Sequence, residues 1–198
     1  MGEIKATMVK ELREQTGAPF IDCKNALVET DGDFEKASEV LRIKGVAKAS
    51  KKTARKTDQG AISSYVHAGG KIGVMLEVNC ETDFVARNEE FQSLCREVAM
   101  QIAANNPVYV RKEEVPEEEI ENEKRILKAE AMESGKPENI AEKMVAGRIN
   151  KFFEEICLLE QPYIRDPKMR ISDLVNALIA KIGENIVVKR FVRYQLGE

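Results

Sequence analysis

Cysteine and histidine, the side chains most often used for metal binding and nucleophilic chemistry, are few and scattered in this chain. The four cysteines form no C-x-x-C pair, and His67 is the only histidine available to join them. A structural zinc site needs four such ligands, usually in close pairs, so the sequence predicts no metal site. Each cysteine lies in an apolar pattern, which is typical of reduced thiols that pack as small hydrophobic residues. The four are Cys23, Cys80, Cys95 and Cys157.

A second candidate for chemistry is the Gly-Gly-Lys sequence at 69–71, which has the residue types of a phosphate-binding loop. Such a loop needs Ser or Thr after the lysine and another glycine upstream. Here Ile72 follows the lysine and the upstream glycine is missing. Apolar residues flank the glycine pair and alternate strictly over 72–78, so the sequence predicts a β-hairpin turn rather than a nucleotide site.

Lysine and arginine gather between Glu39 and Asp58, where no acidic residue occurs. The whole chain has 31 basic and 34 acidic residues, a net charge of −3, which disfavours binding to nucleic acid through bulk positive charge. Residues 42–56 have two interpretations: a basic helix end with a solvated linker, or the footprint of an RNA- or ribosome-associated protein. We favour the linker, because no aromatic platform for stacking on bases accompanies these residues.

Hydrophobic periodicity predicts an α+β fold. Three short helices are expected within residues 1–50, and Gly17 is placed to end the first of them. A basic linker at 51–59 leads to a core domain at 60–198, in which helices flank a small antiparallel sheet.

The core domain begins with the β-hairpin and continues with a helix whose buried stripe includes Phe91 and Ile102. A solvated helix and a more apolar one, within about 117–160, are expected to form an antiparallel helical hairpin. Ser172 is placed to cap one more helix, and a last strand follows from Ile186.

The sequence contains no segment suited to a membrane or to export. The longest stretch without a charge, residues 98–110, is too short and too polar to cross a bilayer. The first residues mix acids and bases and lack an apolar signal core. We therefore expect a cytoplasmic protein without a membrane partner.

Residues 82–85 occupy a corner of the predicted fold, where the second strand of the hairpin gives way to a helix. A turn held at both ends by regular elements can project its side chains outward. The residues alone favour a simpler interpretation, in which Phe84 and Val85 are core residues and Thr82 or Asp83 is an ordinary helix cap.

Four segments of the chain resemble the elongation factor Ts family, in the right order and over nearly the whole length. They are VKELRE and TGA at 9–14 and 16–18, DCKNAL at 22–27, NCETDFVARN at 79–88, and LLEQP with DPK at 158–162 and 166–168. The resemblance implies a translation elongation factor that binds elongation factor Tu in its GDP form, induces exchange of GDP for GTP, and leaves when GTP enters. It implies a nucleotide-exchange factor without a cofactor and without catalysis of bond-making.

In this family the turn that matches Thr82, Asp83, Phe84 and Val85 enters the partner near its nucleotide-bound magnesium. The resemblance therefore implies that Phe84 seats in a pocket of elongation factor Tu and that Asp83 makes polar contacts there. The first 50 residues resemble the family's docking domain and a ubiquitin-associated-type three-helix fold. Val9, Leu12 and Gly17 are its candidates for partner contact, although the same residues fit a buried stripe and a helix stop.

Only one copy of the hairpin and of the Thr-Asp-Phe-Val turn is present, as in the short members of the family. Short relatives form symmetric homodimers, and a lone small sheet with apolar residues favours such pairing. A ubiquitin-like-binding adaptor remains an alternative, suggested only by the three-helix module, and a shared fold is weak support for it.

Overall fold

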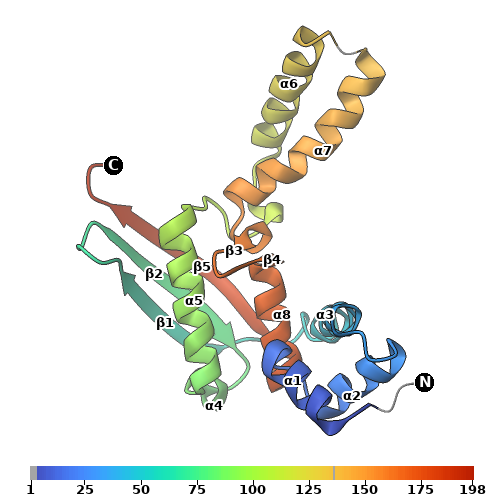
Figure 1. Cartoon of the computed structure of the whole chain (residues 1–198). Helices are drawn as coiled ribbons and strands as arrows, with labels where there is room; N and C mark the ends of the chain where they lie inside the picture. The colour runs from blue at the N-terminus through green and yellow to red at the C-terminus, as the bar shows by residue number, and fades with distance from the viewer. Residues whose placement is uncertain (1–3, 136) are drawn as a thin grey trace. The chain divides into compact units, whose positions relative to one another are not determined.

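The computed structural model describes residues 4–135 and 137–198, and it confirms a mixed α+β fold with a small antiparallel sheet (Figure 1). Residues 1–3, with which the predicted first module starts, lie outside the described residues. The chain divides into two compact units. The first comprises residues up to 63, 76–97 and 172–189, and the second comprises 64–75, 98–171 and 190–198.

Eight α-helices and five strands are assigned in the described residues. The helices are α1 (Ala6–Thr16), α2 (Phe20–Glu29), α3 (Phe34–Ser50), α4 (Asp83–Ala86), α5 (Glu89–Asn105), α6 (Glu117–Glu133), α7 (Glu138–Ile156) and α8 (Ile171–Ile182). The strands are β1 (Gln59–Val66), β2 (Ile72–Cys80), β3 (Pro162–Tyr163), β4 (Asp166–Arg170) and β5 (Ile186–Gln195). Two short 3-10 helices, Lys112–Glu114 and Leu158–Glu160, complete the order.

Helices α1, α2 and α3 pack around a small apolar core, as the periodicity predicts (Figure 1). The glycine that follows α1, Gly17, has a φ of 66° and donates its N–H to the carbonyl of Arg13 at 2.8 Å. Asp33 caps α3 by accepting the N–H of Lys36 at 3.1 Å. The buried side chains of this core are Val9, Leu12, Cys23, Ala26, Leu27, Ala37 and Leu41.

The three-stranded sheet has the order β1-β2-β5, and the predicted hairpin forms its first two strands. Gly69 and Gly70, with φ of 90° and 69°, make the turn between them, a conformation that residues with a Cβ rarely adopt. In β2 the side chains of Val74, Leu76 and Val78 are all buried, as the alternating pattern requires.

Helices α6 and α7 lie side by side as a helical hairpin (Figure 1). Only Leu127 and Ala131 are buried among the described residues of α6, which confirms the expected solvated helix. Lys128 forms ion pairs with Glu138 at 2.8 Å and with Glu142 at 3.5 Å. These pairs are exposed, so each contributes little to stability.

The chain after α7 is shaped by a buried pair of glutamines. Gln101 donates its amide to the side-chain oxygen of Gln161 and to the carbonyl of Pro162, both at 3.1 Å, and accepts the N–H of Ile164 at 3.0 Å. Gln161 in turn donates to the carbonyl of Glu155 at 3.0 Å. Buried polar groups need such partners, so the network fixes the turn into the small β3-β4 hairpin. No periodic pattern in the sequence predicts this hairpin.

One boundary differs from the sequence expectation. Ser172 is predicted to cap the helix before the last strand, but α8 already includes Ile171, so Ser172 lies inside its first turn. No helix in the described ranges is long and apolar enough to cross a membrane.

Candidate functional site: an exposed aromatic tip

The chain turns from β2 into the single helical turn α4 at Thr82. The Thr82 hydroxyl accepts the N–H of Val85 at 3.4 Å, which makes Thr82 the N-cap of this turn. The side chain of Val85 is only 9% exposed, whereas that of Phe84 is 82% exposed. One turn of helix therefore points two adjacent apolar side chains in different directions, Val85 inward and Phe84 into solvent.

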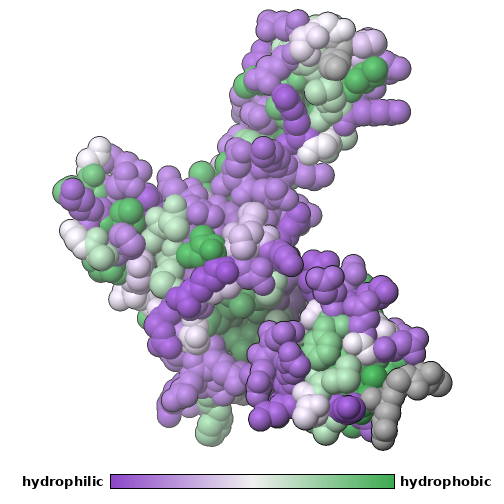
Figure 2. Space-filling model, viewed as in Figure 1, coloured by the Kyte–Doolittle hydropathy of each residue, from purple (hydrophilic) through white to green (hydrophobic). Residues whose placement is uncertain are grey.

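An exposed aromatic ring at a rigid corner is unusual, because a large apolar side chain gains free energy by leaving water. Figure 2 shows an apolar tip where Figure 1 places α4. The simpler interpretation, in which both Phe84 and Val85 belong to the core, holds for Val85 alone.

The backbone of α4 is held on both sides. Before it, the Cys80 thiol donates to the carbonyl of Thr82 at 3.1 Å. After it, the side-chain amide of Gln92 donates to the carbonyl of Ala86 at 2.6 Å. Since Val85 and Ala86 are also buried, the tip is supported by packing as well as by hydrogen bonds.

Asp83 begins α4 and forms an ion pair with Arg87, one turn later, at 3.1 Å. Both side chains are largely in solvent, with exposed fractions of 49% and 80%. An exposed pair of this kind is weak and exchanges readily with other partners. The Asp83 carboxylate is therefore accessible to polar groups of a second molecule.

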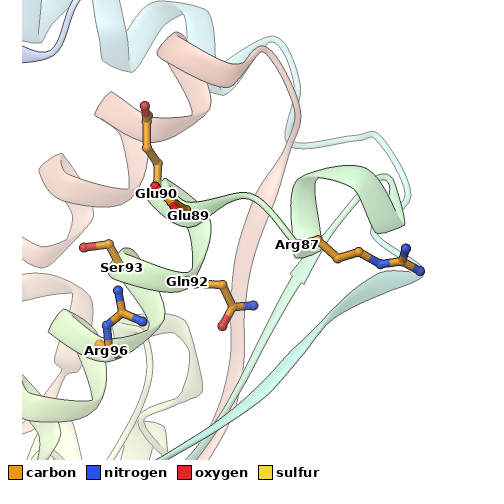
Figure 3. Close-up of a pocket in the computed structure, with 6 residues that line it drawn as sticks. All are labelled: Arg87, Glu89, Glu90, Gln92, Ser93 and Arg96. Atoms are coloured by element: carbon orange, nitrogen blue, oxygen red, sulfur yellow. The ribbon is translucent and has the colours of Figure 1, made fainter.

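A shallow, charged depression lies beside this corner, at the start of α5 (Figure 3). Arg87 points away from the other lining side chains, and Glu90 forms an ion pair with Lys181 at 2.9 Å. The depression is open and polar, unlike the concave, mostly apolar sites that hold small molecules. Its lining residues are Arg87, Glu89, Glu90, Gln92, Ser93 and Arg96.

The other predicted contact residues lie elsewhere, in the three-helix core. Val9 and Leu12 are fully buried between the helices, and Gly17 ends α1. Their contact with a partner stays a prediction. The structure shows directly that they set the packing of α1 and the direction of the chain that leaves it.

The basic stretch after Glu39 is engaged with acids of the same unit. Lys44 pairs with Glu29 at 2.6 Å and Lys48 with Asp22 at 2.7 Å. Longer pairs of 3.5 and 3.4 Å join Arg42 to Asp173 and Arg55 to Glu81. Positive charge balanced in this way attracts phosphate groups less strongly, which disfavours the RNA-binding interpretation.

All four cysteines are buried with free thiols. Burial raises the pKa of the Cys95 thiol to about 12 and the pKa values of the Cys80 and Cys157 thiols to about 11. Because the thiolate is the reactive and metal-binding form, these groups are poor nucleophiles and poor ligands near neutral pH. No cluster of potential metal ligands occurs among the residues that the structure describes.

The raised thiol pKa values predict a loss of stability in alkali. Above pH 9, the ordinary value for these groups, the unfolded chain loses thiol protons that the folded chain retains. The contribution is fully present below pH 9 and disappears as the pH rises through the folded-state pKa values. We expect the free energy of unfolding in urea to fall between about pH 9 and 11, and to fall less in Cys95→Ala. An identical fall in both proteins would contradict the role of Cys95.

The chain is similar to known proteins over nearly its whole length, including residues 82–85. The family model for elongation factor TS matches residues 33–198. Elongation factor Ts of Desulforamulus reducens is 58% identical over 198 residues, which cover 100% of this chain and 91% of that protein. The Carboxydothermus hydrogenoformans protein is 58% identical over 195 residues, 98% of this chain and 90% of its own length. For Caldanaerobacter subterraneus the identity is 56% over 195 residues, 98% of each chain. The chain belongs to the elongation factor Ts family of translation elongation factors.

Proposed function

We propose that this chain binds elongation factor Tu in its GDP form and induces exchange of GDP for GTP by disturbing the magnesium and phosphate site. Membership of the family supports the partner and the type of reaction. The observation that supports the mechanism is the 82% exposure of Phe84 on a turn held at both ends. Exchange makes and breaks no covalent bond, so the proposed role is that of a binding protein and not of an enzyme.

The free energies involved favour Phe84 as the principal residue. Weakening the affinity for nucleotide roughly a thousandfold requires a coupling of about 4 kcal/mol. An exposed ion pair supplies about 0 to 1 kcal/mol. Burial of a phenyl ring of about 150 to 250 Å² at about 25 cal/mol per Å² supplies several kcal/mol before ordering costs. The aromatic tip can therefore provide most of the coupling, and the polar side chains adjust it.

Thermodynamic linkage explains how the factor is released. If the bound factor lowers the affinity of elongation factor Tu for its nucleotide, then bound nucleotide lowers the affinity of elongation factor Tu for the factor by the same ratio. GTP entering the vacated site thus expels the factor, and no hydrolysis is needed. Such a cycle takes place in the cytoplasm, where translation occurs.

The direct test is stopped-flow release of fluorescent GDP from elongation factor Tu, with and without this chain. We expect the release rate to rise with the concentration of the chain and then to saturate. A release rate that does not change at any concentration would overturn the proposed function.

Asp83→Ala should be a milder variant whose defect depends on magnesium. In the proposal, Asp83 competes for or repositions groups that hold the metal, so its effect should shrink when magnesium is removed with a chelator. We expect a fewfold slower release of GDP, about 1 kcal/mol, in magnesium. Arg87→Gln is the matched control, because it removes the ion pair and leaves the carboxylate free. A defect of equal size without magnesium would count against the metal role.

We also propose that residues 1–50 dock on elongation factor Tu, with Val9, Leu12 and Gly17 shaping that module. Residues 51–59 then link the module to the core at 60–198. We further propose that the protein is a homodimer. Helix α3 ends at Ser50 and strand β1 begins at Gln59, which supports the boundaries proposed for the docking module and the linker. The small size of the β1-β2-β5 sheet supports pairing with a second copy. Light scattering tests the dimer, because a mass near 22.3 kDa at micromolar concentration would exclude it.

A further inference from the structure

Glu184 lies in the loop between α8 and β5, and its carboxylate contacts the segment that leads into α4. Its Oε2 accepts hydrogen bonds from the backbone N–H groups of Glu81 at 3.2 Å and Thr82 at 3.0 Å. Its Oε1 accepts the hydroxyl proton of Thr82 at 2.7 Å. One side chain therefore satisfies three donors immediately before the exposed tip.

These bonds fix the direction of the Thr82 hydroxyl. An ionised carboxylate can only accept, so the hydroxyl must donate its single hydrogen to Glu184. The oxygen lone pairs are then free to accept the N–H of Val85, one of the donors that a helix leaves unsatisfied at its first turn. Glu184 thus supports the N-cap of α4 from a position 102 residues away from Thr82.

The loop that holds Glu184 is itself held by the residue next to Thr82. The Oε1 of Glu81 accepts the backbone N–H of Asn185 at 2.6 Å, so the two loops exchange carboxylate-to-backbone bonds. Asn185 is only 2% exposed and donates its amide to the carbonyl of Arg55 at 3.0 Å. The Glu184 carboxylate is therefore attached to a fixed part of the first unit.

We propose that Glu184 is a positioning residue for nucleotide exchange, which holds α4 so that Phe84 is presented in a single orientation. The inference rests on the proposed exchange function. A helix of one turn has too few internal hydrogen bonds to stay ordered alone. Without Glu184 the segment before the tip loses three hydrogen bonds, and the cost of restoring its order when the partner binds reduces the free energy available for coupling.

The first experiment compares Glu184→Ala and Glu184→Gln in the stopped-flow assay of GDP release. We expect the maximal rate to fall about fivefold or more in the alanine variant, with a smaller change in the half-saturating concentration. Glutamine retains one acceptor and the side-chain volume, so its rate should be intermediate. The matched control is Glu90→Gln, which removes a carboxylate paired with Lys181 and should leave the rate unchanged. A wild-type maximal rate in both Glu184 variants would overturn the positioning role.

A double-mutant cycle separates this inference from the proposed function. If Glu184 acts through the ring, Glu184→Ala should change the maximal rate less than about twofold in a Phe84→Ala background. Additive losses would overturn the positioning role and leave the exchange function standing. If elongation factor Tu releases GDP as fast with Phe84→Ala as with the wild type, the proposed role of the Phe84 ring fails, whatever the Glu184 variants do.

A spectroscopic measurement reports the orientation without the partner. The chain has no tryptophan, so Phe84→Trp places a single tryptophan reporter on the tip. Time-resolved anisotropy should show a larger amplitude of nanosecond motion when Glu184→Gln or Glu184→Ala is added, and no increase with Glu90→Gln. An unchanged amplitude in the folded Glu184→Gln protein would contradict the inference even if the alanine variant does not fold.

Discussion

Phe84→Ala is expected to slow release of GDP from elongation factor Tu at least about tenfold at a fixed concentration of the factor, while the protein keeps its fold. The ring is 82% exposed, so its removal takes away almost no contact within the free chain. In the proposed complex the same ring is buried, and a tenfold loss corresponds to only about 1.4 kcal/mol of the several kcal/mol that its burial can supply. Stopped-flow release measures the defect, and thermal unfolding measures the fold.

Two further variants make this prediction specific to the ring. Phe84→Leu keeps part of the apolar area and should lie between the wild type and Phe84→Ala. Val108→Ala also shortens an exposed apolar side chain, since Val108 is 61% exposed, but it lies outside the corner at 82–85 and should have no effect. A wild-type rate of GDP release in the presence of Phe84→Ala would refute the role of the ring. A defect of equal size in Val108→Ala would show that general loss of apolar surface explains the result.

The contrast between Phe84 and Val85 shows a limit of predicting burial from hydrophobic periodicity. The strand before them follows a period of two and the helix after them a period of 3.6, and both periods predict their elements correctly. The turn α4 is only four residues long, too short for either period to assign a face to each side chain. The residues alone therefore favour burial of both, and only the resemblance to a family implies an exposed Phe84.

The support of the tip could not be predicted because it comes from distant parts of the chain. Glu184 and Thr82 are 102 positions apart, and nothing in the sequence around Gly183 and Asn185 marks the loop as a partner of the Thr-Asp-Phe-Val turn. The same limit applies to the β3-β4 hairpin, whose first strand has two residues. Such elements are defined by tertiary hydrogen bonds, here those of Gln101 and Gln161, and not by local pattern.

Gly60→Ala is expected to destabilise the protein more than alanine at either of two other glycines of the hairpin, Gly69 and Gly73. Gly60 in β1 has a φ of 152°, and a Cβ built on it would lie 2.2 Å from the carbonyl oxygen of Val78 and 2.7 Å from the Cα of Asn79. Both atoms belong to the backbone of β2, so no flexible side chain can move aside. We expect a loss of about 3 kcal/mol or more and a decrease in melting temperature of about 6 to 12 °C.

Two other glycines of the hairpin separate the causes of this loss. Gly69→Ala faces an unfavourable φ of 90° but nothing within 4 Å, so it should cost only about 1 kcal/mol. Gly73→Ala meets neither obstacle and should be neutral or slightly stabilising, because alanine restricts the unfolded chain. If Gly60→Ala unfolds at the same temperature as Gly69→Ala, the close approach of β1 to β2 does not add to the loss of stability at Gly60. If Gly60→Ala alone unfolds early, the close approach of the two backbones is the cause. The effect should then extend to exchange, because Val78 and Asn79 lie only a few residues before the turn that carries Phe84.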